Sequence, residues 1–297
     1  MAQITLGVFS PSVLLDVART TGALAAAGLE VRDVPVPSSP AQFASLRAGE
    51  FDAVFTSPDN VLAYRFLPAN PLGELLDVEI VAGLDRGLGL SLAARPGLEG
   101  VPSGGRLAVD VPHSGFAFVC YALLEEIGSA REDFETVALG STPRRAAALL
   151  AGKCDVTVLN AGNELTAREG GCSLLADVTR LGPYLGTVLA RFRDAPGAPE
   201  VERLQRVLVE VAGQLSAGEL DDVATDSASR LLSLTPETAA EHVAILRDPS
   251  RGLVDGTVDS ASLETLVALR RRFLPAPQLD DVTARFDELV REEVLAS

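Results

Sequence analysis

The sequence predicts an α/β protein of two similar lobes, with mixed, mainly parallel sheets, a hinge of two crossovers and a helical C-terminal extension. The chain has 297 residues, enough for two domains of ordinary size. Segment 37–60 (PSSPAQFASLRAGEFDAVFTSPDN) recurs as segment 140–163 (GSTPRRAAALLAGKCDVTVLNAGN), with 8 of 24 positions identical. Apolar strand patterns alternate with helix patterns around both copies, which is typical of parallel strands joined by right-handed crossovers.

The first lobe follows from turn and capping signals. Ser and Pro precede each apolar-periodic stretch, as they do at helix starts, and Gly28 closes the first one. We therefore expect strands at 4–9, 29–36 and 52–56, helices at 13–27 and 38–49, and a polar loop at 57–60.

The second lobe repeats this order. TLGVFSPS aligns with RLAVDVPH at an offset of 101 residues, and the longer repeat has an offset of 103. A nearly constant offset over two segments indicates a duplicated unit. We expect strands at 106–111 and 134–139, a loop at 112–115, a helix at 116–127 and then the second copy of the repeat.

Two extended segments are expected to join the lobes. Segment 81–97 leads from the first lobe to the second and segment 184–192 leads back, which makes a hinge. The predicted division is residues 1–88 plus 190–297 for lobe one and 89–189 for lobe two. Five further helices are expected to pack around lobe one, at 200–217, 220–232, 236–247, 260–273 and 279–295.

Composition excludes several classes of function. The net charge of −16 argues against nucleic acid as a partner, because phosphate binding needs clustered Lys and Arg. No apolar run is long enough for a membrane span. Three irregularly spaced cysteines and two scattered histidines form neither a disulfide framework nor a metal site. The Gly-Leu-Gly at 87–89 lacks the third glycine of a nucleotide fingerprint. We expect no metal and no cofactor.

The first residues, MAQITLGVFS, have none of the features of a secretory signal. As given, the chain is expected in the cytoplasm, and its free thiols favour a reducing compartment. An extracytoplasmic location applies if a leader precedes these residues in the native protein.

Three spans resemble a known fold: PAQFASLRAGEFDAVFTSPDNVLAYR, VDVPHSGFAFVCYALLEEIG and STPRRAAALLAGKCDVTVLN. They are similar to type II periplasmic-binding-protein folds, above all to the solute-binding components of nitrate/sulfonate/taurine-type ABC transporters and to thiamine-pyrimidine synthase-like proteins. The resemblance covers residues 4–192, and the tail GLVDGTVDSASLETLVALRRRF is similar to the C-terminal helices of these proteins. It implies a small-molecule ligand, and an ABC transporter permease as partner if the chain is exported. The same fold serves cytoplasmic enzymes, so it does not settle function.

Ligands of open parallel sheets bind beyond the carboxyl ends of the strands. The loops expected there are rich in Ser, Thr, Asn and Gly, and several begin helices, whose free N–H groups suit carboxylate, sulfonate or phosphate. The alternative to ligand binding is that these residues only cap helices. For each single Ser, this alternative remains open. The predicted ligand-binding residues are Ser10, Ser12, Ser38, Ser39, Thr56, Ser57, Asn60, His113, Ser114, Gly115, Ser141, Thr142, Arg144, Asn160 and Asn163.

Five positions carry the chemistry of this prediction. Ser114-Gly115 opens a helix where Gly115 lets a ligand approach the backbone closely. Arg144 and Arg145 replace Ala41 and Gln42 of the first copy, and either could clamp a carboxylate or belong to a solvated helix face. Arg86 lies in the crossover, where its side chain could point into the cleft, pair with Asp85 or face solvent.

His113 occupies a predicted cleft loop, where the first copy has Ser12. Three roles remain open for His113: a contact with the ligand, a catalytic acid/base oriented by Asp110, or a solvent-facing loop residue. His242 is expected at the surface of a C-terminal helix. The sequence thus favours a solute-binding protein that closes on a small polar or anionic organic ligand, such as a carboxylate, sulfonate or pyrimidine. The alternative is a cytoplasmic enzyme of the decarboxylase or lyase type, acting on a small organic acid with His113 as acid/base.

Overall fold

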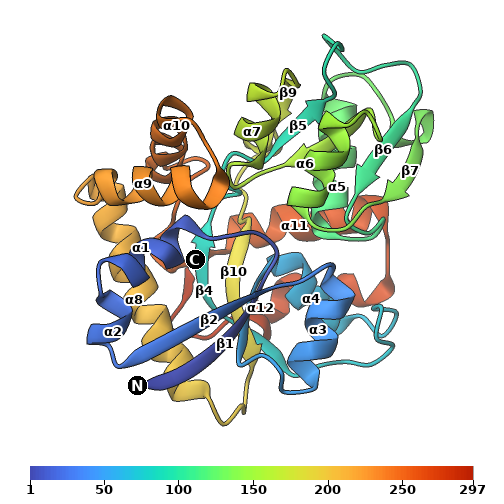
Figure 1. The fold of residues 1–297 in the computed structure, drawn as a ribbon. Coiled ribbons are helices and arrows are strands. Elements are labelled where there is room, and N and C mark those ends of the chain that lie inside the picture. The colour runs from blue at the N-terminus through green and yellow to red at the C-terminus, as the bar shows by residue number, and fades with distance from the viewer. Residues whose placement is uncertain (297) are drawn as a thin grey trace.

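The computed structural model describes residues 1–296 and has two lobes, each built on a five-stranded sheet (Figure 1). The lobe-one sheet has the order β2-β1-β3-β10-β4 and the lobe-two sheet the order β7-β6-β8-β5-β9. The strands of lobe one are β1 (Ala2–Val8), β2 (Leu29–Pro35), β3 (Ala53–Thr56), β4 (Val78–Asp85) and β10 (Thr187–Phe192). Those of lobe two are β5 (Ser91–Ala94), β6 (Arg106–Val109), β7 (Glu135–Ala138), β8 (Val156–Leu159) and β9 (Ser173–Asp177).

Both sheets are mixed in the same way. In lobe one β1 runs parallel to β2 and β3, while β10 is antiparallel to β3 and β4. In lobe two β6 runs parallel to β7 and β8, while β5 is antiparallel to β8 and β9. The chain crosses between the lobes from β4 to β5 and from β9 to β10. The predicted fold class, with two similar lobes and a two-crossover hinge, is confirmed. The predicted boundary at 189/190 falls inside β10, and the division of the chain by residue number stays a prediction.

The repeat has the same hydrogen bonds in both lobes. The Asp52 carboxylate accepts from the Thr5 amide at 2.7 Å, and the Asp155 carboxylate accepts from the Arg106 amide at 2.8 Å. The bonds tie the turn before the buried strand to β1 in lobe one and to β6 in lobe two. The turn itself needs a left-handed residue, and Gly49 and Gly152 supply it with φ of 73° and 64°. The shared Gly–x–x–Asp turn is therefore a structural device.

The helices of the lobes follow the expected order with three differences. They are α1 (Val13–Thr20), α2 (Ala23–Ala26), α3 (Ser39–Arg47), α4 (Pro58–Phe66), α5 (Gly115–Glu126), α6 (Thr142–Leu150) and α7 (Asn163–Glu169). The single helix expected at 13–27 is divided in two, because Gly22 has a φ of 79°. The expected loop at 57–60 is wrong: Ser57 caps α4 and Pro58 is its first residue, the position that favours Pro. Helix α7 was not expected.

The C-terminal extension contains α8 (Ala198–Ala217), α9 (Asp221–Leu232), α10 (Pro236–Arg247) and α11 (Ser260–Phe273), close to the expected ranges. The helix expected at 279–295 is wrong. Only α12 (Phe286–Leu289) forms there, among short 3₁₀ turns, and β12 (Leu295–Ala296) pairs with β11 (Val258–Asp259). Val290 is extended beside Ile80, and the Arg291 amide donates to the Ile80 carbonyl at 3.1 Å. Pairing with the edge of β4 thus overrides the helical pattern.

The C-terminal helices do not all pack on lobe one alone. Helices α8 and α9 cover α1, as expected, but α11 lies against α5 of lobe two (Figure 1). Helix α10 reaches lobe two through an ion pair of Glu241 with Arg168 of α7. Besides their contacts with lobe one and with α8 and α9, helices α11 and α10 therefore also contact lobe two and bridge the two lobes.

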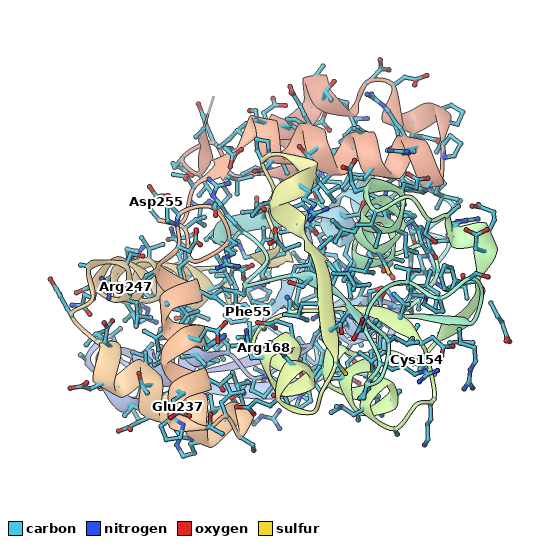
Figure 2. The ribbon with its side chains drawn as sticks, turned by 90° about the horizontal axis from the view of Figure 1, so that it is seen from above. Phe55, Cys154, Arg168, Glu237, Arg247 and Asp255 are labelled. Carbon is cyan, nitrogen blue, oxygen red and sulfur yellow. The ribbon has the colours of Figure 1, made fainter. Side chains whose placement is uncertain are left out.

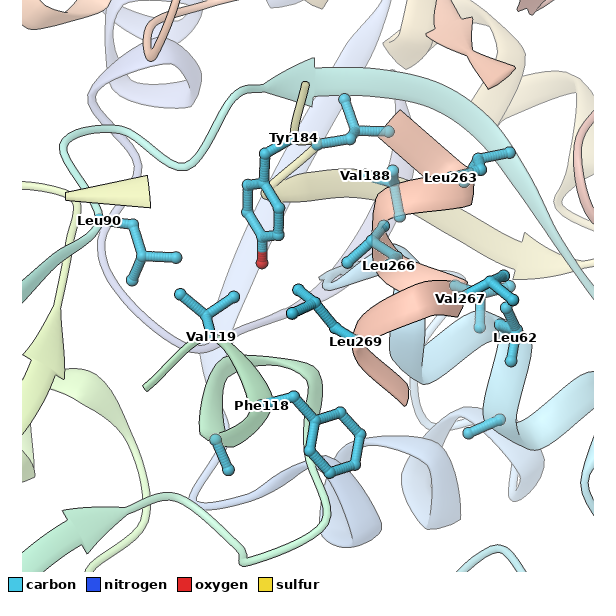
Figure 3. Close-up of a cluster of buried hydrophobic side chains, with 14 of the residues drawn as sticks. Leu62, Leu90, Phe118, Val119, Tyr184, Val188, Leu263, Leu266, Val267 and Leu269 are labelled. Carbon is cyan, nitrogen blue, oxygen red and sulfur yellow. The ribbon is translucent and has the colours of Figure 1, made fainter. Parts of the chain in front are cut away.

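One hydrophobic cluster continues from lobe one into lobe two. Figure 3 shows Leu62 of α4, Phe118 and Val119 of α5, Val188 of β10 and Leu266 of α11 as members of this cluster. Apolar packing therefore joins the lobes along α4, α5 and α11, whereas the contacts between α7 and α10 include charged and polar pairs. Within residues 1–296 no helix is long and apolar enough to cross a bilayer.

Candidate functional site

A cavity of about 100 Å³ lies between the lobes, and α10 with the loop after it completes its wall. A cavity of this order suits a ligand on the scale of one small ring or a short organic acid. In Figure 2 the wall residue Phe55 lies near the middle of the molecule, between α10, which carries Glu237 and Arg247, and the lobe that carries Cys154. The apolar wall residues include Phe9, Val13, Leu14, Phe55, Leu84, Leu88, Phe116, Leu246 and Leu253.

Ten of the fifteen predicted ligand-binding residues line this cavity. They are Ser10, Ser12, Thr56, Ser57, Asn60, Ser114, Gly115, Ser141, Thr142 and Asn160. The structure brings these residues together from both lobes, and their contact with a ligand stays a prediction. Ser38, Ser39, His113, Arg144 and Asn163 are not part of the wall.

Four helices begin at the cavity: α1, α4, α5 and α6. The hydroxyls of Ser12, Ser57 and Ser114 each accept from an amide of their own helix, at 3.1–3.2 Å. Ser141 makes no such bond. Among the described residues, the first amides of α5 and α6, those of Gly115 and Thr142, donate to no protein acceptor. The cavity thus offers free N–H groups at positive helix ends, which suits an anion.

In lobe two the positive charge at the cavity wall comes from Arg145, and not from Arg144 as predicted. Arg145 is 1% exposed and lines the cavity, whereas Arg144 is exposed. Helical spacing explains the difference, because Thr142, Arg145 and Leu149 share the buried face of α6. That spacing was readable from the sequence.

Arg145 takes the place that Gln42 has in lobe one. The Gln42 amide donates to the Phe55 carbonyl at 3.0 Å, and Arg145 donates to the matching Val158 carbonyl at 3.2 Å. Arg145 also donates to the Gly140 carbonyl at 2.6 Å and to the Thr142 hydroxyl at 3.2 Å. The repeat therefore keeps the hydrogen bond and adds a buried positive charge in lobe two alone.

Asp110 is the acidic neighbour of this arginine. It lines the cavity, and its carboxylate accepts from the Ser114 hydroxyl. Burial raises the pKa of Asp110, and the positive charge of Arg145 opposes that shift. The sequence suggests that Asp110 orients His113, but its hydrogen-bond partner is Ser114, and the positive charge that acts on it is that of Arg145.

The two histidines lie opposite to the prediction, one at the surface and the other at the cavity. His113 is exposed and outside the cavity, and only its carbonyl is engaged, accepting from Arg270 at 3.3 Å. His242 was expected at the surface, which is wrong: it is 1% exposed and lines the cavity. Its spacing from the buried Thr238, Ala239 and Leu246 places it on the inner face of α10. Burial lowers the pKa of His242 to about 4, so its imidazole is neutral near pH 7.

Gly115, whose contact with a ligand stays a prediction, also has a steric role between the lobes. A Cβ there would lie 2.7 Å from the Asp59 side chain of lobe one. The glycine therefore permits close approach of the two lobes. Asp59 is held by Arg270 of α11 through two bonds of 2.6 Å, and Arg270 lies over the Phe118 ring at 5.0 Å. This cluster fixes the starts of α4 and α5 relative to each other.

The remaining candidates have structural partners. Ser38 caps α3, Asn163 donates to the Asn160 carbonyl at 2.9 Å, and Arg86 pairs with Asp259 at 3.1 Å. The three cysteines are free and buried, and burial raises the pKa of the Cys120 thiol to about 12. No group of three His, Cys, Asp or Glu that could hold a metal occurs in residues 1–296.

Comparison with solved structures identifies proteins with a similar fold. No family model and no curated protein matches the chain. Among solved structures, the alkanesulfonate-binding protein SsuA from Xanthomonas axonopodis pv. citri, bound to MOPS, is similar at a TM-score of 0.73 and 17% identity, over 100% of this chain and 98% of that one. The periplasmic nitrate-binding protein NrtA from Synechocystis PCC 6803 has a TM-score of 0.77 and 13% identity, over 98% of this chain and 86% of that one.

A third similar structure is the Candida albicans CA3427 gene product, described as exhibiting the generic periplasmic-binding-protein fold, with a TM-score of 0.70 and 14% identity over 98% and 97% of the two chains. At these identities the likeness concerns the fold. The strand orders, the double crossover and the full-length superpositions agree with the resemblance of the three sequence spans. The chain has the type II periplasmic-binding-protein fold.

Proposed function

We propose that the protein is a solute-binding protein whose lobes close on a small organic ligand with a carboxylate, sulfonate or similar anionic group. The observation that carries the proposal is the cavity between the lobes, where four helices begin. Free amides at the starts of α5 and α6 would bind the anionic group. The apolar wall around Phe9, Phe55 and Phe116 would contact the rest of the ligand.

The similar solved structures favour a role in transport. Several similar structures are named as binding components of import systems or as periplasmic proteins. Their likeness supports a role outside the cytoplasm with an ABC permease as partner. The enzyme alternative rested on His113 as acid/base, and the exposed position of that side chain, outside the cavity, gives it no support.

A thermal-shift screen tests the proposal. The panel contains carboxylates and sulfonates, each with an uncharged analogue, and pyrimidines. A ligand present at 100 times its Kd stabilises the folded state by about 2.7 kcal/mol, and we expect anionic members alone to raise Tm measurably. Stabilisation by the uncharged analogues, with none from the acids, would contradict the proposed anionic group.

A further inference from the structure

Asp85 is a buried acid in the cavity wall that has no basic partner. It is the last residue of β4, at the crossover, and is 3% exposed. Its Oδ1 accepts from the Gly87 amide at 2.7 Å. In the described part of the chain no Lys, Arg or His makes an ion pair with it. Its neighbour Arg86 points to Asp259 and Ser262 instead.

Three other buried acids of this protein are paired with arginine. Asp59 binds Arg270, Glu79 binds Arg191 at 3.0 Å, and Asp16 binds Arg230. An unpaired buried carboxylate is costly, so a missing partner at a cavity wall needs an explanation. Burial raises the pKa of Asp85 to about 6, and hydrogen bonds from Thr187 and the Gly87 amide oppose the shift. The carboxyl is therefore mostly charged at pH 7.

His242 is a second unsatisfied group on the same wall. Its Nδ1 is buried and has no hydrogen-bond partner. Asp85 and His242 line the same cavity. A neutral imidazole adds one donor and one acceptor to the carboxylate, but no positive charge.

We infer that Asp85, with His242 on the same cavity wall, forms a subsite for a protonated amine or a similar cationic N–H group of the ligand. The inference rests on the proposed function and narrows it: the ligand is a small acid that also carries an amine. The anionic group binds at the starts of α5 and α6, and the amine at the hinge, where β4 ends. The ligand thereby supplies the positive charge that the protein leaves out beside Asp85, through a charge-assisted hydrogen bond.

Matched ligand pairs test the subsite. Calorimetric titrations compare β-alanine with propionate and 3-aminopropane-1-sulfonate with propane-1-sulfonate, on the wild type, Asp85→Asn and Asp194→Asn. Asp194 is exposed and serves as the control. We expect the wild type and Asp194→Asn to bind the amine of each pair about 10-fold or more tightly than its analogue. Asp85→Asn should lose this preference and bind the amine-free acids as the wild type does.

The outcomes separate the two proposals. Equal binding of both members of each pair by the wild type would overturn the Asp85 subsite and leave the proposed function standing. An amine preference that survives in Asp85→Asn would also overturn it. If neither member of any pair binds, and the anion panel gives no stabilisation, the proposed function fails and the subsite fails with it.

Discussion

Replacing Arg270 with alanine is expected to lower the free energy of unfolding by about 3–5 kcal/mol, because it leaves a buried carboxylate without its partner. The side chains of Arg270 and Asp59 are 4% and 1% exposed, and two bonds of 2.6 Å join them. The same guanidinium donates to the His113 carbonyl and lies over Phe118 of lobe two. Arg270 thus holds together α11, the start of α4 and the loop before α5.

Arg272, two residues along α11, is the matched control. It is 57% exposed and pairs with Glu125 on the surface of α5, so Arg272→Ala should cost less than about 1 kcal/mol. Urea unfolding of both variants measures the difference. Adding Asp59→Asn to Arg270→Ala should recover part of the loss, since it removes the unpaired charge. Equal costs for the two arginines would show that the Asp59 pair does not support the lobe contact.

Glu164→Gln is expected to remove a pH dependence of stability worth about 4 kcal/mol. Glu164 is 1% exposed beside Gly89 and Ile245, and neither carboxylate oxygen has a hydrogen-bond partner. Burial raises the pKa of Glu164 from 4.5 to about 8. Between these values the folded state keeps a proton that the unfolded state releases, so the wild type loses stability as pH rises and levels off above 8.

The measurement is the free energy of unfolding from pH 4.5 to 9 for the wild type, Glu164→Gln and Glu126→Gln. Glu126 is an exposed residue at the end of α5 and should leave the wild-type profile unchanged. The buried amide of Gln changes the free energy of unfolding by the same amount at every pH. The difference in slope between the wild-type and Glu164→Gln profiles therefore reports the ionisation of the Glu164 carboxyl. A Glu164→Gln profile parallel to that of the wild type would mean that Glu164 is already ionised in the folded protein.

The sequence predicts much of this fold because the duplicated unit is a local signal. Capping serines, the Gly–x–x–Asp turn and apolar strands lie close together in the chain, and they place the cavity loops of both lobes. The C-terminal region depends on contacts between distant residues. Val290 leaves the helical pattern to pair with Ile80, and α10 brings His242 to the cavity from another part of the chain.

The errors at the candidate site have different causes. His113 was favoured because it replaces Ser12 in the repeat, but its loop turns the side chain outward while Ser114 faces the cavity. Arg145 was readable by combining two signals, its alignment with Gln42 and its phase on α6. Asp85 carries no local signal, since its unpaired state depends on where Arg86 points.

The central claim is that ligand binds in the cavity between the lobes, and a single tryptophan tests it most directly. The chain contains no Trp, so Phe116→Trp, in the cavity wall, and Phe51→Trp, outside it, report without background. We titrate each variant with a compound that raises the Tm of the wild type. The account predicts a saturable change in the emission of the Phe116→Trp protein and none in the Phe51→Trp protein. A compound that stabilises both variants yet leaves the emission of Trp at position 116 unchanged would place the ligand elsewhere.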